Sequence, residues 1–295
     1  MTQKKADLLI ATISMAWGTS YLLMKLGLTG IAPCTLIALR FGFAFAITGV
    51  IFPRRIMQTD LRTLAYSALV GLILFGIFIA LLYGLKTTTA SAAGFLTSTT
   101  VIFVPLLQAL LTRRLPKPPI IAGVLVIMTG IGLLTIKNSL VIESGSALCL
   151  LGAFFYAVHI IVTNSFAQKT DALQLGICQL GFATVYGLIF SVLFEKPAFP
   201  ATPTEWVAVL GLAVVCSAFG FVVQPIAQQF TTPERTGILF ALEPVFAALF
   251  GFVFLQEILQ LQGYIGAVLV LCGVFIAGLQ QPKDSYKVMD NAANE

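Results

Sequence analysis

The sequence of 295 residues is 58% hydrophobic and only 10% charged, whereas a soluble domain of this length carries roughly a quarter of charged residues. That composition leaves too little polar surface to cover a water-soluble globule, so it excludes a soluble fold and indicates an all-α integral membrane protein. A formal net charge of +5 is compatible with nucleic-acid binding, but the basic residues lie between apolar stretches, where membrane topology explains them, and we expect no nucleic-acid partner.

Ten apolar stretches are long enough to cross a bilayer as helices, which takes about 20 residues each. We predict spans at Leu8–Gly27, Ile31–Phe52, Thr63–Gly84, Ser91–Thr112, Pro119–Ile136, Gly145–Phe166, Ala172–Phe194, Trp206–Gln228, Gly237–Leu255 and Gln262–Leu279. The connections are short, and no soluble domain fits between spans. The polar segment 281–295 is predicted to be a disordered cytoplasmic tail.

The first span resembles a signal peptide, because Lys4 and Lys5 precede an apolar run. Two features argue against cleavage. The run is long enough to cross a membrane, and it has an internal counterpart at Ala147–Asn164. We therefore expect this segment to be the first membrane helix.

The distribution of lysine and arginine predicts which loops face the cytoplasm. With the N-terminus inside, the outer side keeps only Lys25, Lys86, Lys137 and Lys196, and Arg40 lies within a span. The positive-inside rule therefore favours an even number of spans with both termini in the cytoplasm. The expected location is a bacterial inner membrane.

Spans 1–5 and 6–10 look like two copies of one unit, at residues 7–137 and 145–280. A constant offset pairs Gly94 with Gly237, and similar matches occur along both halves. Five spans is an odd number, so the second copy enters the membrane from the opposite side. Inverted repeats recur in secondary transporters, with the substrate site near the membrane midplane between the halves.

The same offset places Arg114 opposite Glu257. Arg114 lies at a predicted cytoplasmic turn and Glu257 at an external one, where positive charge is disfavoured. The reversal of charge therefore follows from topology and requires no function for Glu257.

Several short motifs occur in order along the chain. They are AWG in span 1, the segment from Pro33 to Arg40, TTASAAGFLTSTTVIFVPLL across span 4, and LEPVFAALFG, LQEIL and YIGAVLVLCGV across spans 9 and 10. Through these motifs the chain resembles the drug/metabolite transporter superfamily, specifically its ten-helix EamA-type members, over roughly residues 7 to 280. The resemblance implies a metabolite transporter, with export favoured over uptake. It does not fix the substrate, because members carry amino acids, nucleosides, sugars and other small metabolites.

Glu243 is a carboxylate in the centre of span 9, and ionisable groups inside a bilayer are costly and mark function by default. It would couple protons or meet a substrate amine. The alternative is a structural carboxylate that bonds backbone freed by Pro244. The first copy has Thr100-Val101 at this place, so strict two-fold symmetry of the site is not expected.

Arg40 lies in span 2, where its repeat partner is Gln179. A guanidinium can hold a carboxylate or phosphate with two parallel hydrogen bonds. The alternative is an internal salt bridge, for instance to Glu243, that locks helices together. Lys25, near the outer end of span 1, is more simply explained as extending to the membrane interface.

His159 is the only histidine and lies in span 6. It is a second candidate for proton coupling, because histidine titrates near neutral pH. The alternative is a buried histidine that satisfies one neighbouring hydroxyl or carbonyl.

Polar and aromatic side chains recur at three- to four-residue steps in several spans and so share one helix face. With Arg40, His159 and Glu243, the candidate cavity residues are Trp17, Tyr21, Phe78, Thr97, Tyr156, Gln179 and Gln224. Glutamine and paired hydroxyls have no use on a lipid-facing surface, so these should face the interior. For threonine, hydrogen bonding between helices is an equal alternative, and Phe78 would stack on a substrate or fill a helix contact.

Glycine and proline permit bends within helices. The candidate hinges are Gly18, Gly76, Gly220 and Pro225. Spans 5 and 10 lack charged residues and carry glycines at spacings of seven, which indicates supporting helices or an oligomer surface.

Motifs of other functional classes do not occur. The sequence has no G-x-x-x-x-G-K-[ST] loop, no HExxH, no GxSxG and no histidine cluster, and its five cysteines lack metal-ligand spacing and are expected to be buried free thiols. We therefore expect no enzyme, no cofactor, no metal site and no ATPase subunit.

The predicted function is a secondary transporter of a small polar or zwitterionic metabolite, such as an amino acid, that works by alternating access. Its partners are the substrate and the lipid bilayer, with protons as a candidate coupling ion, and it is a monomer or a homodimer. Two rival classes stay open. A passive facilitator or channel would show neither saturation nor counterflow, and a membrane sensor or assembly partner would keep its activity without Glu243 and Arg40.

Overall fold

The computed structural model describes residues 1–88, 90–135, 145–255 and 260–278, and every regular element in those ranges is a helix. The predicted all-α fold is confirmed. The elements are α1 (Gln3–Trp17), α2 (Ser20–Gly27), α3 (Pro33–Ile51), α4 (Pro53–Met57), α5 (Leu61–Lys86), α6 (Ala90–Ser98), α7 (Thr100–Thr112), α8 (Pro118–Thr135), α9 (Ser146–Ala167), α10 (Ala172–Phe194), α11 (Pro203–Gly211), the π-helix η1 (Leu212–Phe221), α12 (Val222–Gln228), α13 (Pro233–Phe240), α14 (Glu243–Leu255) and α15 (Leu261–Gly278). The predictions for Lys137, Glu257 and the tail at 281–295 fall outside the described residues.

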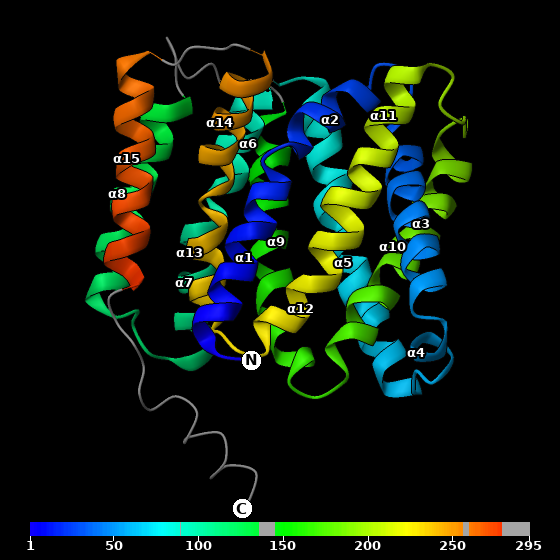
Figure 1. Ribbon diagram of the computed structural model, residues 1–295, viewed down its shortest axis with the longest axis horizontal. Helices are drawn as coiled ribbons and strands as arrows, with labels where there is room; N and C mark the ends of the chain where they lie inside the picture. Colours follow the sequence, from blue (N-terminus) through cyan, green and yellow to red (C-terminus); the bar gives the residue numbers. More distant parts are fainter. Residues whose placement is uncertain (89, 136–144, 256–259, 279–295) are drawn as a thin grey trace, which may run out of the picture.

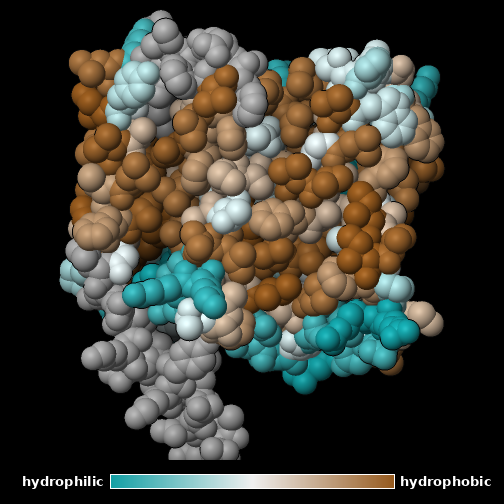
Figure 2. Space-filling model, viewed as in Figure 1, coloured by the Kyte–Doolittle hydropathy of each residue, from teal (hydrophilic) through white to brown (hydrophobic). Residues whose placement is uncertain are grey.

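Eight helical stretches of the described chain are long and apolar enough to cross a membrane, and Pro118–Leu133 is a shorter apolar helix. The helices run side by side between the two ends of the molecule, and α1 begins at the same end at which α15 finishes (Figure 1). Figure 2 shows hydrophobic residues over most of the visible face and hydrophilic ones gathered toward its ends. The protein is therefore a multi-pass membrane protein. The count of ten spans stays a prediction, because residues 233–255 form two short helices.

Three predicted spans are broken where the sequence analysis expected continuous helices. The breaks fall at Gly18–Thr19, at Thr99 and at Ala241–Leu242. The Thr19 hydroxyl donates to the Ala16 carbonyl at 2.8 Å, and the Thr99 hydroxyl donates to the Leu96 carbonyl at 2.5 Å. Such side-chain bonds offer the backbone an alternative to the helical ladder. Pro244 has a similar effect after the third break, because it removes one helical hydrogen bond.

The predicted eighth span contains the π-helix η1 between α11 and α12. Pro225 has no N–H group to donate to the Phe221 carbonyl one turn earlier. Gln179 replaces that donor, with its Nε2 atom 2.8 Å from the Phe221 oxygen. The Cys216 carbonyl within η1 accepts a hydrogen bond from the Trp17 Nε1 atom at 2.7 Å. Side chains of α1 and α10 thus complete the hydrogen bonding of this helix, and this fixes their own positions.

Helices at equivalent places in the two predicted copies lie against each other. The α3–α10 and α8–α15 pairs form two of the most extensive interhelical contacts, and α5 packs on α9 much as η1 and α12 pack on α1. A two-fold relation between the copies predicts this arrangement. The repeat boundaries themselves stay a prediction.

Glycines bring α8 and α15 into backbone contact. A Cβ atom at Gly123 would lie 2.7 Å from the Gly273 carbonyl oxygen, and one at Gly130 would lie 2.6 Å from the Gly266 oxygen. The glycines spaced by seven residues therefore form a contact within the chain. The five cysteines are free thiols, but Cys272 is exposed on α15, which differs from the expectation that all are buried.

We expect Gly130→Ala to destabilise the protein and Gly278→Ala to leave it unchanged or slightly more stable. The new methyl group at Gly130 would meet backbone atoms of α15 that have no room to retreat, and such overpacking costs about 1–3 kcal/mol. Gly278 has no heavy atom within 4 Å of an added Cβ. Thermal unfolding of both variants in detergent tests the contrast. Equal unfolding midpoints for the two variants would show that the α8–α15 contact can accommodate a methyl group at Gly130.

Candidate functional site

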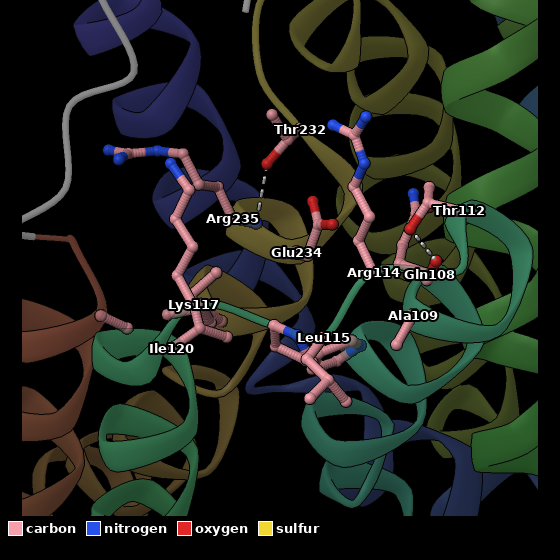
Figure 3. A pocket seen from close by; sticks show the side chains of 14 residues that line it. Gln108, Ala109, Thr112, Arg114, Leu115, Lys117, Ile120, Thr232, Glu234 and Arg235 are labelled. Carbon is pink, nitrogen blue, oxygen red and sulfur yellow. Dashed lines mark hydrogen bonds between the residues drawn. The ribbon is translucent and has the colours of Figure 1, made fainter.

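A large cavity lies at one end of the bundle and is not the predicted site. It has a volume of about 250 Å³ and is formed by α7, the following connection, α8 and α13. Its ionic side chains include Arg114, Lys117, Glu234 and Arg235, which Figure 3 shows arising from the α7–α8 connection and from α13. None of the predicted site residues lines it. Its loop arginine and lysine are exposed, so water satisfies their charge.

A smaller, buried cavity of about 30 Å³ lies between the helices of both halves. It is lined by Trp17, Ser20, Tyr21, Met24, Arg40, Ile77, Phe78, Leu81, Thr97, Tyr156, Phe221 and Glu243. Seven of these were candidates from the sequence: Trp17, Tyr21, Arg40, Phe78, Thr97, Tyr156 and Glu243. The volume holds about two water molecules. The space is therefore too small for a metabolite, and the cavity is closed to one in this arrangement.

Arg40 is the least exposed of the lysine, arginine, aspartate and glutamate residues that the structure describes. The side chain is 1% exposed, its Nε donates to the Ser217 hydroxyl at 3.1 Å, and its guanidinium lies 4.2 Å from the centre of the Phe78 ring. Its Nη1 atom has no hydrogen-bond partner among the described residues. The expected alternative of a salt bridge to Glu243 is not formed, since the described ion pairs join Arg55 with Asp171 and Arg235 with Asp7. A buried guanidinium with an unused donor can bind an anionic group.

Aromatic rings surround the cavity and hold Trp17 in place. The Trp17 ring lies 4.8 Å from the centres of both Phe221 and Phe240 and 5.9 Å from that of Tyr156. The Tyr156 hydroxyl is buried without a partner among the described residues. Rigid rings thus shape an apolar wall in which single polar atoms remain available, as ligand sites require.

Glu243 begins α14 directly after the break in the ninth predicted span and is 8% exposed. It interacts with the side chain of Tyr21, which in turn interacts with Thr97. A second cavity of about 10 Å³ shares Thr97, Tyr156 and Glu243 and continues toward Gly237. The carboxylate therefore lies between two small cavities.

The remaining candidates lie beside the cavity. His159 Nε2 is 3.0 Å from the Gln179 Oε1 atom, and Gln179 donates to the Phe221 carbonyl as described above. Gln224 Nε2 donates to the Gln228 Oε1 atom at 3.4 Å. All three residues are completely buried and do not line the cavity. Of these, His159 and Gln179 contact Phe221, which lines the cavity, through its ring and its carbonyl oxygen.

The four candidate hinges have different surroundings. A Cβ at Gly220 would lie 2.4 Å from the Trp17 Nε1 atom, and one at Gly18 would lie 2.9 Å from the Ala247 nitrogen. At Gly76 the nearest atom, in the Phe155 ring, is 3.5 Å away. Gly18 and Gly220 thus permit close approach of helices, whereas Gly76 has ordinary room. Hinge motion at these glycines and at Pro225 stays a prediction.

We expect Gly220→Ala to impair the site and Gly76→Ala to be tolerated. The new methyl group at Gly220 would displace the Trp17 ring and break its hydrogen bond to the Cys216 carbonyl, with a cost of about 1–3 kcal/mol. The chain has only two tryptophans. Tryptophan fluorescence in a Trp206→Phe background therefore reports the displacement directly, and an unchanged spectrum in Gly220→Ala would contradict it.

Several residues beside the cavity are not among those predicted from the sequence. Ser217 and Phe221 come from the π-helix, and Phe41 lies with its ring centre 4.9 Å from the Arg40 guanidinium. A serine or phenylalanine in an apolar span gives no signal by itself. The proximity of Phe41 to Arg40 in sequence was the only available indication.

Comparison with known proteins agrees with this architecture. A model of the EamA-like transporter family matches twice, at residues 4–136 and 143–279. An uncharacterized transporter from Archaeoglobus fulgidus is 27% identical over 292 residues, covering 94% of this chain and 98% of the relative. The uncharacterized transporter YetK from Bacillus subtilis is 26% identical over 239 residues, covering 78% and 72%. One crystal structure superposes with a TM-score of 0.78 at 21% identity, covering 94% of this chain and 97% of the other, which shows the same fold.

Proposed function

Because this chain belongs to the EamA-like transporter family, we propose that it is a secondary transporter that binds a small zwitterionic metabolite, an amino acid in the first instance, in the central cavity. The observation that carries the proposal is the chemistry of that cavity. A buried guanidinium with an unused donor and a buried carboxylate line the same space. The two groups are complementary to the carboxylate and the amine of one ligand.

The size of the cavity supports alternating access as the mode of transport. A space for about two waters cannot hold an amino acid, so binding requires the helices to separate on one side. Arg40 comes from α3 and Glu243 from α14, so movement of the two halves would change the distance between the two charges. Glu243 is also the candidate proton carrier, because a buried carboxylate can exchange its charge for a proton.

The further features of the proposal come from the family and from the charge distribution. We propose export as the direction, a bacterial inner membrane with cytoplasmic termini as the location, and a monomer or homodimer as the working unit. Nucleosides, sugars and other metabolites are the alternative substrates. An uncharged sugar would leave the Arg40 guanidinium without an anionic partner, so the cavity chemistry favours a substrate with a carboxylate or a phosphate.

A counterflow screen in proteoliposomes tests the proposal. Vesicles loaded with an unlabelled candidate should take up the labelled form transiently, and the rate should saturate with concentration. A passive channel would give neither saturation nor counterflow. Absence of flux for amino acids, nucleosides and sugars under any imposed gradient would contradict a transport function altogether.

A further inference from the structure

Lys25, at the end of α2, holds two backbone carbonyls on another part of the bundle. Its Nζ atom donates to the Leu85 oxygen at 2.7 Å and to the Thr88 oxygen at 3.1 Å. Leu85 lies in the last turn of α5, and Thr88 lies in the connection to α6. The position of Lys25 in the sequence predicts an ammonium that extends to the membrane interface. It instead ties α2 to the segment that leads into α6.

Asn164, near the end of α9, makes the same pair of contacts in the other half. Its Nδ2 atom donates to the Gln228 oxygen at 2.7 Å and to the Thr231 oxygen at 3.0 Å. Gln228 ends α12, and Thr231 lies in the connection to α13. The amide therefore ties α9 to the segment that leads into α13.

The two sets of contacts involve equivalent residues of the two predicted copies. The offset that pairs Arg40 with Gln179 also pairs Lys25 with Asn164. The offset that pairs Gly94 with Gly237 also pairs Leu85 and Thr88 with Gln228 and Thr231. Each copy thus bonds the same two carbonyls with a different donor, an ammonium in the first and an amide in the second.

These contacts lie at opposite ends of the molecule. Figure 1 places α2 at the end far from the start of the chain and α12 at the end near it. The tied helices carry cavity residues, because Tyr21 lies on α2 and Tyr156 on α9, while Thr97 lies on α6. An opening at either end has to part the helices that one of these donors holds together.

We propose that Lys25 and Asn164 are the gating residues of the two ends, and that each end opens only when its donor releases both carbonyls. This inference rests on the proposed transport cycle. Both sets of bonds are formed here, which agrees with the closed cavity. The bonds from Lys25, at the predicted outer end, are charge-assisted and hence roughly twice as strong as the bonds from Asn164 at the predicted inner end. At the inner end, two further contacts also hold the helices together. Arg235 Nη2 lies 2.5 Å from Asp7 Oδ2, and Gln168 Nε2 donates to the Gln229 oxygen at 2.9 Å.

Hydrogen exchange of the intact protein in lipid nanodiscs tests the proposal without any substrate. In Lys25→Met, exchange of the amides around Leu85 and Thr88 should rise by about tenfold, while exchange around Gln228 stays at the wild-type level. In Asn164→Leu, exchange around Gln228 and Thr231 should rise by about threefold, and the outer end should stay protected. Lys25→Gln, which keeps a neutral donor, should give an intermediate rise.

The matched controls replace nearby lysines that make none of the hydrogen bonds formed by Lys25 or Asn164. Lys86→Met at the outer end and Lys169→Met at the inner end should leave both protection patterns unchanged, because these exposed side chains bond none of the four carbonyls. A rise of similar size at both ends in either gating variant would indicate general destabilisation and overturn the proposal. A variant indistinguishable from its control would overturn it equally. Since exchange needs no ligand, a failed transport screen is a separate result that bears on the proposed function alone.

Discussion

Replacing Arg40 with glutamine should weaken binding of a carboxylate-bearing substrate by about two orders of magnitude, because truncating one member of a buried charge pair costs 2–5 kcal/mol. Glutamine is the residue at the equivalent position of the second copy, Gln179, so the helix tolerates its size there. Arg40 also contacts Ser217 and Phe78, and the amide would keep some of that packing. The expected loss is therefore mainly in ligand affinity, measured by ligand-induced thermal shift and by counterflow.

The control for this variant is Arg62→Gln. The exposed Arg62 guanidinium lies 5.5 Å from the centre of the Tyr66 ring, outside the cavity, and its loss should leave affinity within about twofold of the wild type. If Arg40→Gln folds and binds a carboxylate ligand as the wild type does, Arg40 has only a structural role in packing α3 against η1.

Replacing Glu243 with glutamine should reduce proton-driven accumulation of substrate at least about tenfold, while counterflow continues. The amide has nearly the same shape and can still bond Tyr21, but it can neither take up nor release a proton. The dependence of the transport rate on pH should disappear in this variant. Accumulation and counterflow measured in the same proteoliposomes at several pH values provide the test.

The control is Glu234→Gln, in the larger cavity at the end of the bundle, which should retain the wild-type pH dependence (Figure 3). If Glu243→Gln lowers counterflow and accumulation equally, Glu243 binds the substrate amine and does not couple protons. If it keeps the wild-type pH dependence, the carboxylate has no part in proton movement.

The sequence located most of the candidate cavity because polar and aromatic residues are rare inside apolar spans. Trp17 and Tyr21 are four residues apart and share a face of the first span, and both line the cavity. Arg40 and Glu243 are ionisable groups with no use on a lipid-facing surface, and both line it too. The period of a helix and the cost of buried charge were enough for these assignments.

The rest depended on contacts that no local pattern encodes. The π-helix arises where Trp17 and Gln179 supply donors from distant helices, so its own sequence does not predict it. The polarity of His159 and Gln179 predicts a place in the cavity, but the two side chains bond each other behind its wall. The contacts of Lys25 have no local signal, because the two carbonyls that it bonds lie 60 and 63 residues away in the sequence.

The pairing of α3 with α10 and of α8 with α15 has a consequence for synthesis. The ribosome delivers α3 and α8 to the membrane before the helices that cover them have been made. During that interval the glycine face of α8 meets lipid tails, which its internally bonded backbone tolerates. The early half is therefore incompletely packed until α15 has been made and its glycines pack on that face. Insertion is thus ordered from first helix to last, whereas packing is completed only when the late helices arrive.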